Sequence, residues 1–305
     1  MKPKNLTLAV ASICLSALAV APLVSAEELV SKTVSLEDVH SIVLEGGYDL
    51  NVTQGDEEFV KITAPRSMLS KVVAEVKGSR LHLHHKRSSF SMSIFDFKSS
   101  AVFDVQLKDI REIEVAGSGE TTVGSIESDD LTIASAGSGE MTVQNLTVDT
   151  FSLEVAGSAS VDVGEISADR VDVEIAGSPE VEIAEIKSDR EVNFELAGSA
   201  ELQIGDLVTR ELGVEMAGSV DVVIDGEGAV DIQMIEIAGS GDYAAEHIVS
   251  QKAEIEAAGS ADIVINVIDY LSVEAMGSAE VVYHGDPKVI SDVSGSSEIR
   301  RLDEH

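Results

Sequence analysis

The sequence has no tryptophan, one cysteine and five prolines, and aromatic residues make up only 4% of its 305 positions. The single cysteine, Cys14, lies in an apolar N-terminal run, so we expect no disulfide or thiolate chemistry in the rest of the chain. Few rings are available to stack on the faces of a sugar. These shortages disfavour a thiol enzyme and an aromatic-lined carbohydrate cleft.

Basic residues are also scarce, with 21 Lys and Arg against 55 Asp and Glu. The imbalance lies in residues 117–305, which hold 8 basic and 40 acidic residues. Such a charge repels nucleic acid and anionic lipid headgroups. We therefore expect no nucleic-acid partner. The expected partner is an unidentified envelope or surface protein or polysaccharide, either cationic or bridged by divalent cations; the sequence leaves the oligomeric state open.

The N-terminus has the pattern of a secretory signal peptide. Lys2 and Lys4 precede an apolar run over residues 6–24, and small residues end the segment at Ala26. Residues 1–26 are therefore predicted to direct export to the periplasm, the cell surface or the medium. No later run approaches the ~18 apolar residues of a spanning helix, so we expect no membrane span.

A phrase of apolar and acidic residues around Ala-Gly-Ser recurs from residue 114 onward. Its Gly-Ser pairs are separated by 20, 20, 20, 21, 20, 21, 20, 18 and 18 residues. Self-similarity at this period is typical of a solenoid, in which each coil buries its apolar face against its neighbours. The predicted turn residues are Gly117, Ser118, Gly137, Ser138, Gly157, Ser158, Gly177, Ser178, Gly198, Ser199, Gly218, Ser219, Gly239, Ser240, Gly259, Ser260, Gly277, Ser278, Gly295 and Ser296.

Apolar and polar residues alternate with period two on both sides of each Gly-Ser pair. Residues 171–186, for example, read V-D-V-E-I-A-G-S-P-E-V-E-I-A-E-I. This alternation indicates strands with one buried and one wet face. The prediction is an all-β chain that forms a parallel β-helix with two sheets and about 20 residues per coil.

The chain divides into four predicted segments. After the signal peptide, residues 27–112 form an N-terminal β region that caps the solenoid or supplies irregular first coils. Residues 113–302 form the β-helix of ten Gly-Ser coils, and residues 303–305 form a tail. A cap is expected because an open end exposes unpaired strand edges and core.

Carboxylates recur at two fixed places in the coil, three residues before and three residues after the corner glycine. Stacked coils place equivalent residues in columns, where like charges repel. A solvated acidic face that keeps the protein soluble is the leading interpretation. The alternative is a ladder that binds a divalent cation, with Ca²⁺ as the one cofactor considered. Its residues are Glu201, Asp221, Asp242, Asp262 and Glu280.

Two histidines, His82 and His84, alternate with leucines and share one face of a predicted strand, a spacing seen among zinc ligands. An exposed strand face explains the same pattern, and two ligands do not complete a zinc site. The sequence has no Gly-x-Ser-x-Gly elbow, His-Glu-x-x-His motif or Gly-rich phosphate loop. No catalytic or cofactor-binding residues are therefore predicted.

These features resemble the auto-transporter adhesin head GIN domain family of bacteria. The resemblance rests on the Gly-rich run at residues 41–55, the serial Gly-Ser corners and the closing residues 293–301. It implies a right-handed β-helix whose sheets meet at the Gly-Ser turns, a role in adhesion, and no catalytic residues to transfer.

The sequence thus predicts an exported, non-enzymatic β-solenoid that presents an acidic surface for adhesion or envelope interaction. The alternative is a carbohydrate-active β-helix, either a polysaccharide lyase or a hydrolase, because such enzymes share this architecture.

Overall fold

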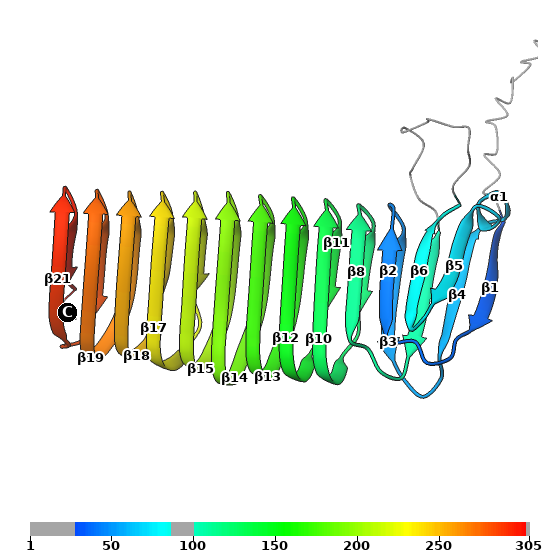
Figure 1. Cartoon of the computed structure of the whole chain (residues 1–305), viewed down its shortest axis with the longest axis horizontal. Helices are drawn as coiled ribbons and strands as arrows, with labels where there is room; N and C mark the ends of the chain where they lie inside the picture. Colours follow the sequence, from blue (N-terminus) through cyan, green and yellow to red (C-terminus); the bar gives the residue numbers. More distant parts are fainter. Residues whose placement is uncertain (1–27, 87–100, 303–305) are drawn as a thin grey trace, which may run out of the picture.

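The computed structural model describes residues 28–86 and 101–302. In this part the chain forms one rod of stacked coils, with the N-terminal elements at one end and β21 (Lys288–Gly295) at the other (Figure 1). The predicted signal peptide, residues 1–26, and the predicted tail, residues 303–305, lie outside the described residues.

The elements before the repeats are β1 (Leu29–Ser35), β2 (Ser41–Glu45), β3 (Asp49–Gln54), β4 (Phe59–Pro65), α1 (Arg66–Leu69), β5 (Val72–Lys77), β6 (Arg80–His85) and β7 (Val102–Leu107). The repeats contain β8 (Glu112–Gly117), β9 (Glu120–Val123), β10 (Ile126–Gly137), β11 (Glu140–Val143), β12 (Leu146–Gly157), β13 (Ser160–Gly177), β14 (Glu180–Gly198), β15 (Glu201–Gly218), β16 (Asp221–Ile224), β17 (Gly228–Gly239), β18 (Asp242–Gly259), β19 (Asp262–Gly277), β20 (Glu280–His284), β21 and β22 (Glu298–Arg301).

Each coil has two layers of parallel strand. The pre-corner layer contains the segments that end at a corner glycine, such as β8, and the post-corner layer contains the segments that start three residues later, such as β9. Each coil bends a second time where the post-corner layer passes into the next pre-corner layer, and we call this bend the second corner. Strands such as β13 continue through it without a break, so both layers belong to one hydrogen-bonded sheet wrapped around the core. The predicted parallel β-helix with about 20 residues per coil is confirmed, and its handedness stays a prediction.

The core consists of columns of equivalent apolar side chains. Val173, Phe194 and Val214 are register partners in successive coils, and all are at most 1% exposed. The alternation within the coil agrees with the sequence pattern, because Val181 and Ile183 are buried while their neighbours Glu180 and Glu182 are exposed. Most of the stability of the rod therefore comes from burial of these columns between the two layers.

The corner glycines stack directly on one another. The ten predicted glycines are register partners from coil to coil. From Ser138 to Ser296, each serine N–H that follows a corner glycine donates to the glycine carbonyl of the preceding coil, as in Ser199 N to Gly177 O at 2.8 Å. Gly198 has φ +114°, and a Cβ built on it would lie 2.3 Å from Gly177 O. The corner thus requires glycine twice, for its backbone angle and for the close approach of the previous coil.

Differences in coil length are absorbed at the second corner. Register shifts occur between Ala168 and Arg170, where a coil gains a residue, and between Ala245 and Val249, where a coil shortens. A one-residue shift in a strand would turn every side chain to the other face. Because the shifts stay at the second corner, the core columns and the Gly-Ser corner keep their register along the rod.

The N-terminal region extends the rod and then closes it. β2 lies parallel to β8, and β3 lies parallel to β9, so these two strands add a coil below the first repeat. Gly46 supplies the corner of that coil, with φ +119° and its N–H donating to Ala116 O at 2.8 Å. β4 then pairs antiparallel with β7, β1 with β4, and β5 with β6. Antiparallel strands therefore form the outer edge of both layers at this end.

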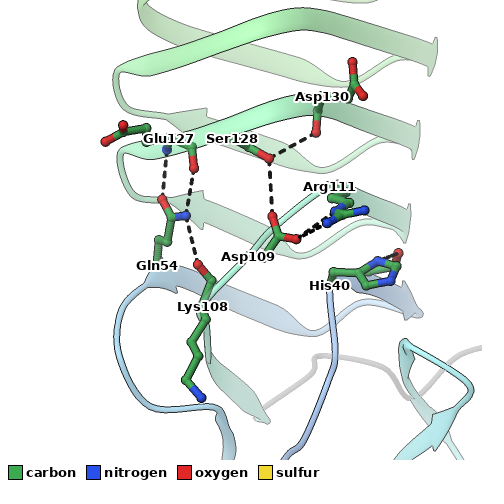
Figure 2. Close-up of polar contacts among 9 residues, drawn as sticks. His40, Gln54, Lys108, Asp109, Arg111, Glu127, Ser128 and Asp130 are labelled. Atoms are coloured by element: carbon green, nitrogen blue, oxygen red, sulfur yellow. Dashed lines mark hydrogen bonds and ion pairs between the residues drawn. The ribbon is translucent and has the colours of Figure 1, made fainter.

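A polar network joins this region to the first repeats (Figure 2). The Gln54 side-chain amide donates to Lys108 O and Glu127 O, and its oxygen accepts from Glu127 N at 2.8 Å. Asp109 accepts from Arg111 Nε at 2.7 Å and from Ser128 Oγ at 3.5 Å. The Gln54 side-chain amide thus pairs with both the N–H and the C=O of Glu127, as a neighbouring backbone strand would.

We expect Gly198→Val to lower the free energy of unfolding by about 1–3 kcal/mol, because the side chain forces both a strained backbone angle and a clash with Gly177 O. The same change at Gly295 meets a similar clash, with φ +81° and a Cβ 2.5 Å from Gly277 O, but it should cost less, since the last described coil can shift without disturbing a coil above it. Gly124→Ala is the control, because its Cβ would meet Val52 O at an ordinary 3.4 Å. A loss of melting temperature at Gly198 no larger than that of Gly124→Ala would contradict the stacked-corner interpretation.

Candidate functional site: an acidic groove on the pre-corner layer

A continuous groove of about 820 Å³ runs along the outer face of the pre-corner layer. Two outward columns line it, with the buried column between them as part of the lining. The Glu column lies three residues before each corner glycine and contains Glu114, Glu154, Glu174, Glu195, Glu215, Glu236, Glu256 and Glu274, with Ala134 in the second coil. The Ala column lies one residue before the glycine and contains Ala136, Ala156, Ala176, Ala197, Ala217, Ala238 and Ala258, followed by Met276.

The hollow follows from the sizes of these side chains. An alanine side chain ends at Cβ while the neighbouring glutamate extends three atoms further, so the Ala column forms a floor and the Glu column forms a wall. From Glu114 to Glu274 the column crosses eight strand spacings of about 4.8 Å, a length of about 38 Å. The site is therefore a long, open track rather than a closed pocket.

The electrostatics of the groove are of one sign. Among the residues that the structure describes, no basic residue lines the groove, and the only ion pair of the Glu column joins Glu114 to Arg80, at 3.8 Å. The column is otherwise a row of exposed carboxylates in register from coil to coil. Such a row focuses a negative potential along the track and attracts positive charge.

The carboxylate ladder predicted from the sequence lies on the opposite, post-corner layer. Its members are register partners in the order Glu201, Asp221, Asp242, Asp262 and Glu280. Partial burial, with the neighbouring carboxylates of Asp221 and Asp262, raises the pKa of Asp242. At the end of the ladder, Arg300 Nε donates to Glu280 at 2.6 Å. The predicted stacking is present, and cation binding by the ladder stays a prediction.

The two candidate zinc ligands lie on β6 and share its half-buried face. His84 Nε2 lies 3.3 Å from Glu75 Oε1, and its Nδ1 lies 2.9 Å from His85 O. Hydrogen bonds from Lys77 and His84 lower the pKa of Glu75. Within residues 28–86 and 101–302, no three His, Cys, Asp or Glu side chains are grouped to hold a metal ion.

A polar group that the sequence pattern did not predict lies inside the core. Gln233 occupies the core column of Leu212 and Ala253, and its Nε2 donates to Ser250 Oγ at 2.6 Å. The Tyr243 hydroxyl donates to Gln233 Oε1 at 3.3 Å, and burial raises the pKa of this tyrosine. A single polar residue at an inward position of the repeat is the signal that identifies such a group. Tyr243 is 0% exposed, so its ring is not available to an external ligand.

We expect the variant Asp221→Asn, Asp242→Asn, Asp262→Asn to be slightly more stable than the wild type at pH 7, because it removes repulsion along the ladder. A raised folded-state pKa means that the folded protein takes up its proton first. The wild type should therefore gain stability as the pH falls through the raised pKa of Asp242 toward the ordinary value of 3.8, and the advantage of the variant should shrink there. Thermal melts from pH 7 to pH 4 measure both effects.

The control for the ladder is Glu215→Gln, Glu236→Gln, Glu256→Gln, which removes the same charge from the opposite layer. We expect CaCl₂ and NaCl to shift the melting temperature of the wild type alike at matched ionic strength. A rise that only Ca²⁺ produces, and that disappears in the Asn variant but not in the Gln control, would contradict this and establish the cation ladder.

In the part of the chain that the structure describes, no helix is long and apolar enough to cross a membrane. Among curated proteins, none matches this chain in sequence. Solved structures that match this chain include a putative adhesin from Parabacteroides distasonis ATCC 8503, which is 19% identical, with a TM-score of 0.49 and coverage of 90% of this chain and 98% of that chain.

A putative adhesin from Parabacteroides merdae ATCC 43184 is 15% identical, with a TM-score of 0.45 and coverage of 90% of this chain and 97% of that chain. A putative lipid binding protein from Parabacteroides distasonis ATCC 8503 is 18% identical, with a TM-score of 0.46 and the same coverage. A family model for the "Putative auto-transporter adhesin, head GIN domain" matches residues 38–227 and 188–287. Together these ranges span most of the sequence, and the chain therefore belongs to this head GIN domain family.

Proposed function

We propose that the protein is an exported, non-enzymatic adhesin that contacts its partner through the acidic groove. The observation that carries the proposal is the groove itself, a track about 38 Å long in which the Glu column recurs from coil to coil without a basic residue among its lining. Family membership supports an adhesin-like role. Export rests on the predicted signal peptide.

The charge of the groove favours a cationic partner, specifically an extended Lys- or Arg-rich segment of another envelope or surface protein. Each exposed charge pair contributes little by itself. A row of such pairs on one track acts together, because binding at one carboxylate raises the local concentration of the next cation along the segment. The flat Ala floor admits an extended backbone beside the wall of carboxylates. Binding of this kind weakens steeply as salt rises.

The enzymatic alternative has less support. Tyr243 is buried in the core, and Tyr270 and Tyr283 are half-buried and lie in different layers of the rod. They do not form a platform for stacking sugar rings. The groove carries carboxylates in a uniform column, without a distinct pair in contrasting environments, which a glycosidase requires for its acid and base.

The groove is tested with Glu174→Gln, Glu195→Gln, Glu215→Gln and a fluorescent oligo-lysine peptide. We expect about tenfold weaker binding at low salt from the loss of three neighbouring charge pairs. The matched control is Glu180→Gln, Glu201→Gln, Asp221→Asn, which removes three charges from the other layer of the adjoining coils. Equal losses in both variants would mean that the peptide responds to total charge and not to the groove.

Export is tested in fractionated cells of the source bacterium. We expect the chain without residues 1–26 outside the cytoplasm, and on intact cells we expect added protease to degrade it. Intact full-length protein in the cytoplasmic fraction would overturn the proposed location, and a protease-resistant periplasmic pool would place the partner inside the envelope.

A further inference from the structure

The two layers of the rod end differently at their two ends. At the N-terminal end, antiparallel strands β1 and β5 form the outer edges. At the other end, β21 pairs only with β19, and β22 pairs only with β20, among the described strands. Each of these last strands keeps a free row of backbone N–H and C=O groups. Free parallel edges with core beneath them invite pairing with another chain.

The core columns change character in this last coil. Three inward positions that are apolar in the coil below become polar where the rod ends. Val273 is succeeded by Ser291, Tyr283 by Arg301, and Ala279 by Ser297. Val273 and Ala279 are at most 1% exposed, whereas Ser291 is exposed. Side chains in β21 and β22 still point alternately inward and outward, so these polar side chains occupy the inward places that a next coil would cover.

Two of the three residues have defined partners. Ser297 Oγ accepts a hydrogen bond from Ala279 N at 3.2 Å, which satisfies a backbone group of the coil below. Arg301 forms an ion pair with Asp286 at 2.7 Å and keeps its side chain 45% exposed. Covering Arg301 with another coil or chain would remove this charge from water at a large cost.

Charge repulsion does not protect this end. Residues 288–305 contain three basic residues, Lys288, Arg300 and Arg301, against four acidic residues, Asp292, Glu298, Asp303 and Glu304, so this end is close to neutral. The rest of the solenoid is strongly acidic and repels a second copy, but here two copies would meet with little net repulsion. Ile290 and Val293 also remain 48% and 43% exposed. Protection against association therefore has to come from the polar inward positions.

We propose that Ser291, Ser297 and Arg301 form a stop that prevents end-to-end pairing with a second copy of this chain. The arrangement that they prevent has a two-fold axis normal to both layers, which pairs β21 with its copy and β22 with its copy, each antiparallel. In that dimer both layers continue across the junction, and the inward positions of the two copies face each other. Two Arg301 side chains and four serines would then be buried together.

The test compares Ser291→Val, Ser297→Ala, Arg301→Val with a control that makes similar changes at outward and corner positions of the same end, Ser294→Val, Ser296→Ala, Arg300→Val. Sedimentation velocity gives the mass of each protein over a concentration series. We expect the wild type and the control to have the same mass, and the stop variant to reach about twice that mass through isologous pairing.

Arg301→Val is measured alone as well, because it is the smallest change that uncovers the core and it remains informative if the triple variant precipitates. To identify the interface, Ile290→Lys is added to the stop variant, since Ile290 is 48% exposed on the edge strand β21 and a charge there opposes strand pairing. Dimer that dissociates on this addition supports the stop. The proposed stop would be overturned if the triple stop variant and Arg301→Val both kept the wild-type mass. It would also be overturned if the control variant associated as strongly as the stop variant.

Discussion

The structure depends on one close backbone contact, the stacking of each corner glycine on the glycine carbonyl of the coil below. Because a Cβ at Gly198 would lie 2.3 Å from that oxygen, the contact admits only glycine, and it holds neighbouring coils at one strand spacing. The contact recurs at every coil, so it also fixes the register of both layers. Core columns, the Glu column and the carboxylate ladder are all consequences of this one alignment.

The sequence predicts this alignment because the same kinds of residue recur at the same positions of every coil. Period-two alternation identifies which of Val181 and Glu182 is buried, and the Gly-Ser series identifies the corner. The groove was not predicted, since alanine before Gly177 reads equally well as a small residue needed at the bend. Ala176 is exposed because its side chain points outward from the pre-corner layer, and the groove forms because the longer side chain of Glu174 stands beside it.

Residues that depart from the repeat are less predictable from the sequence than residues that follow it. Gln54, in an irregular N-terminal strand, has no equivalent from which its bond to the Glu127 backbone follows. Gln233 and Arg301, in contrast, stand at inward positions that are apolar elsewhere, and aligning the coils by their corner glycines would have singled out both. In a solenoid, a residue that breaks its column is thus as informative as one that keeps it.

The second corner gives the protein a different kind of freedom. It accommodates coils of 18 to 21 residues while the Gly-Ser corner stays in register. Additional chain can therefore enter at the second corner without disturbing the core or the acidic groove on the far side of the coil. The rod therefore has one edge that is constant, at the Gly-Ser corners, and one edge whose length varies, at which loops can be inserted at regular intervals while the acidic groove stays unchanged.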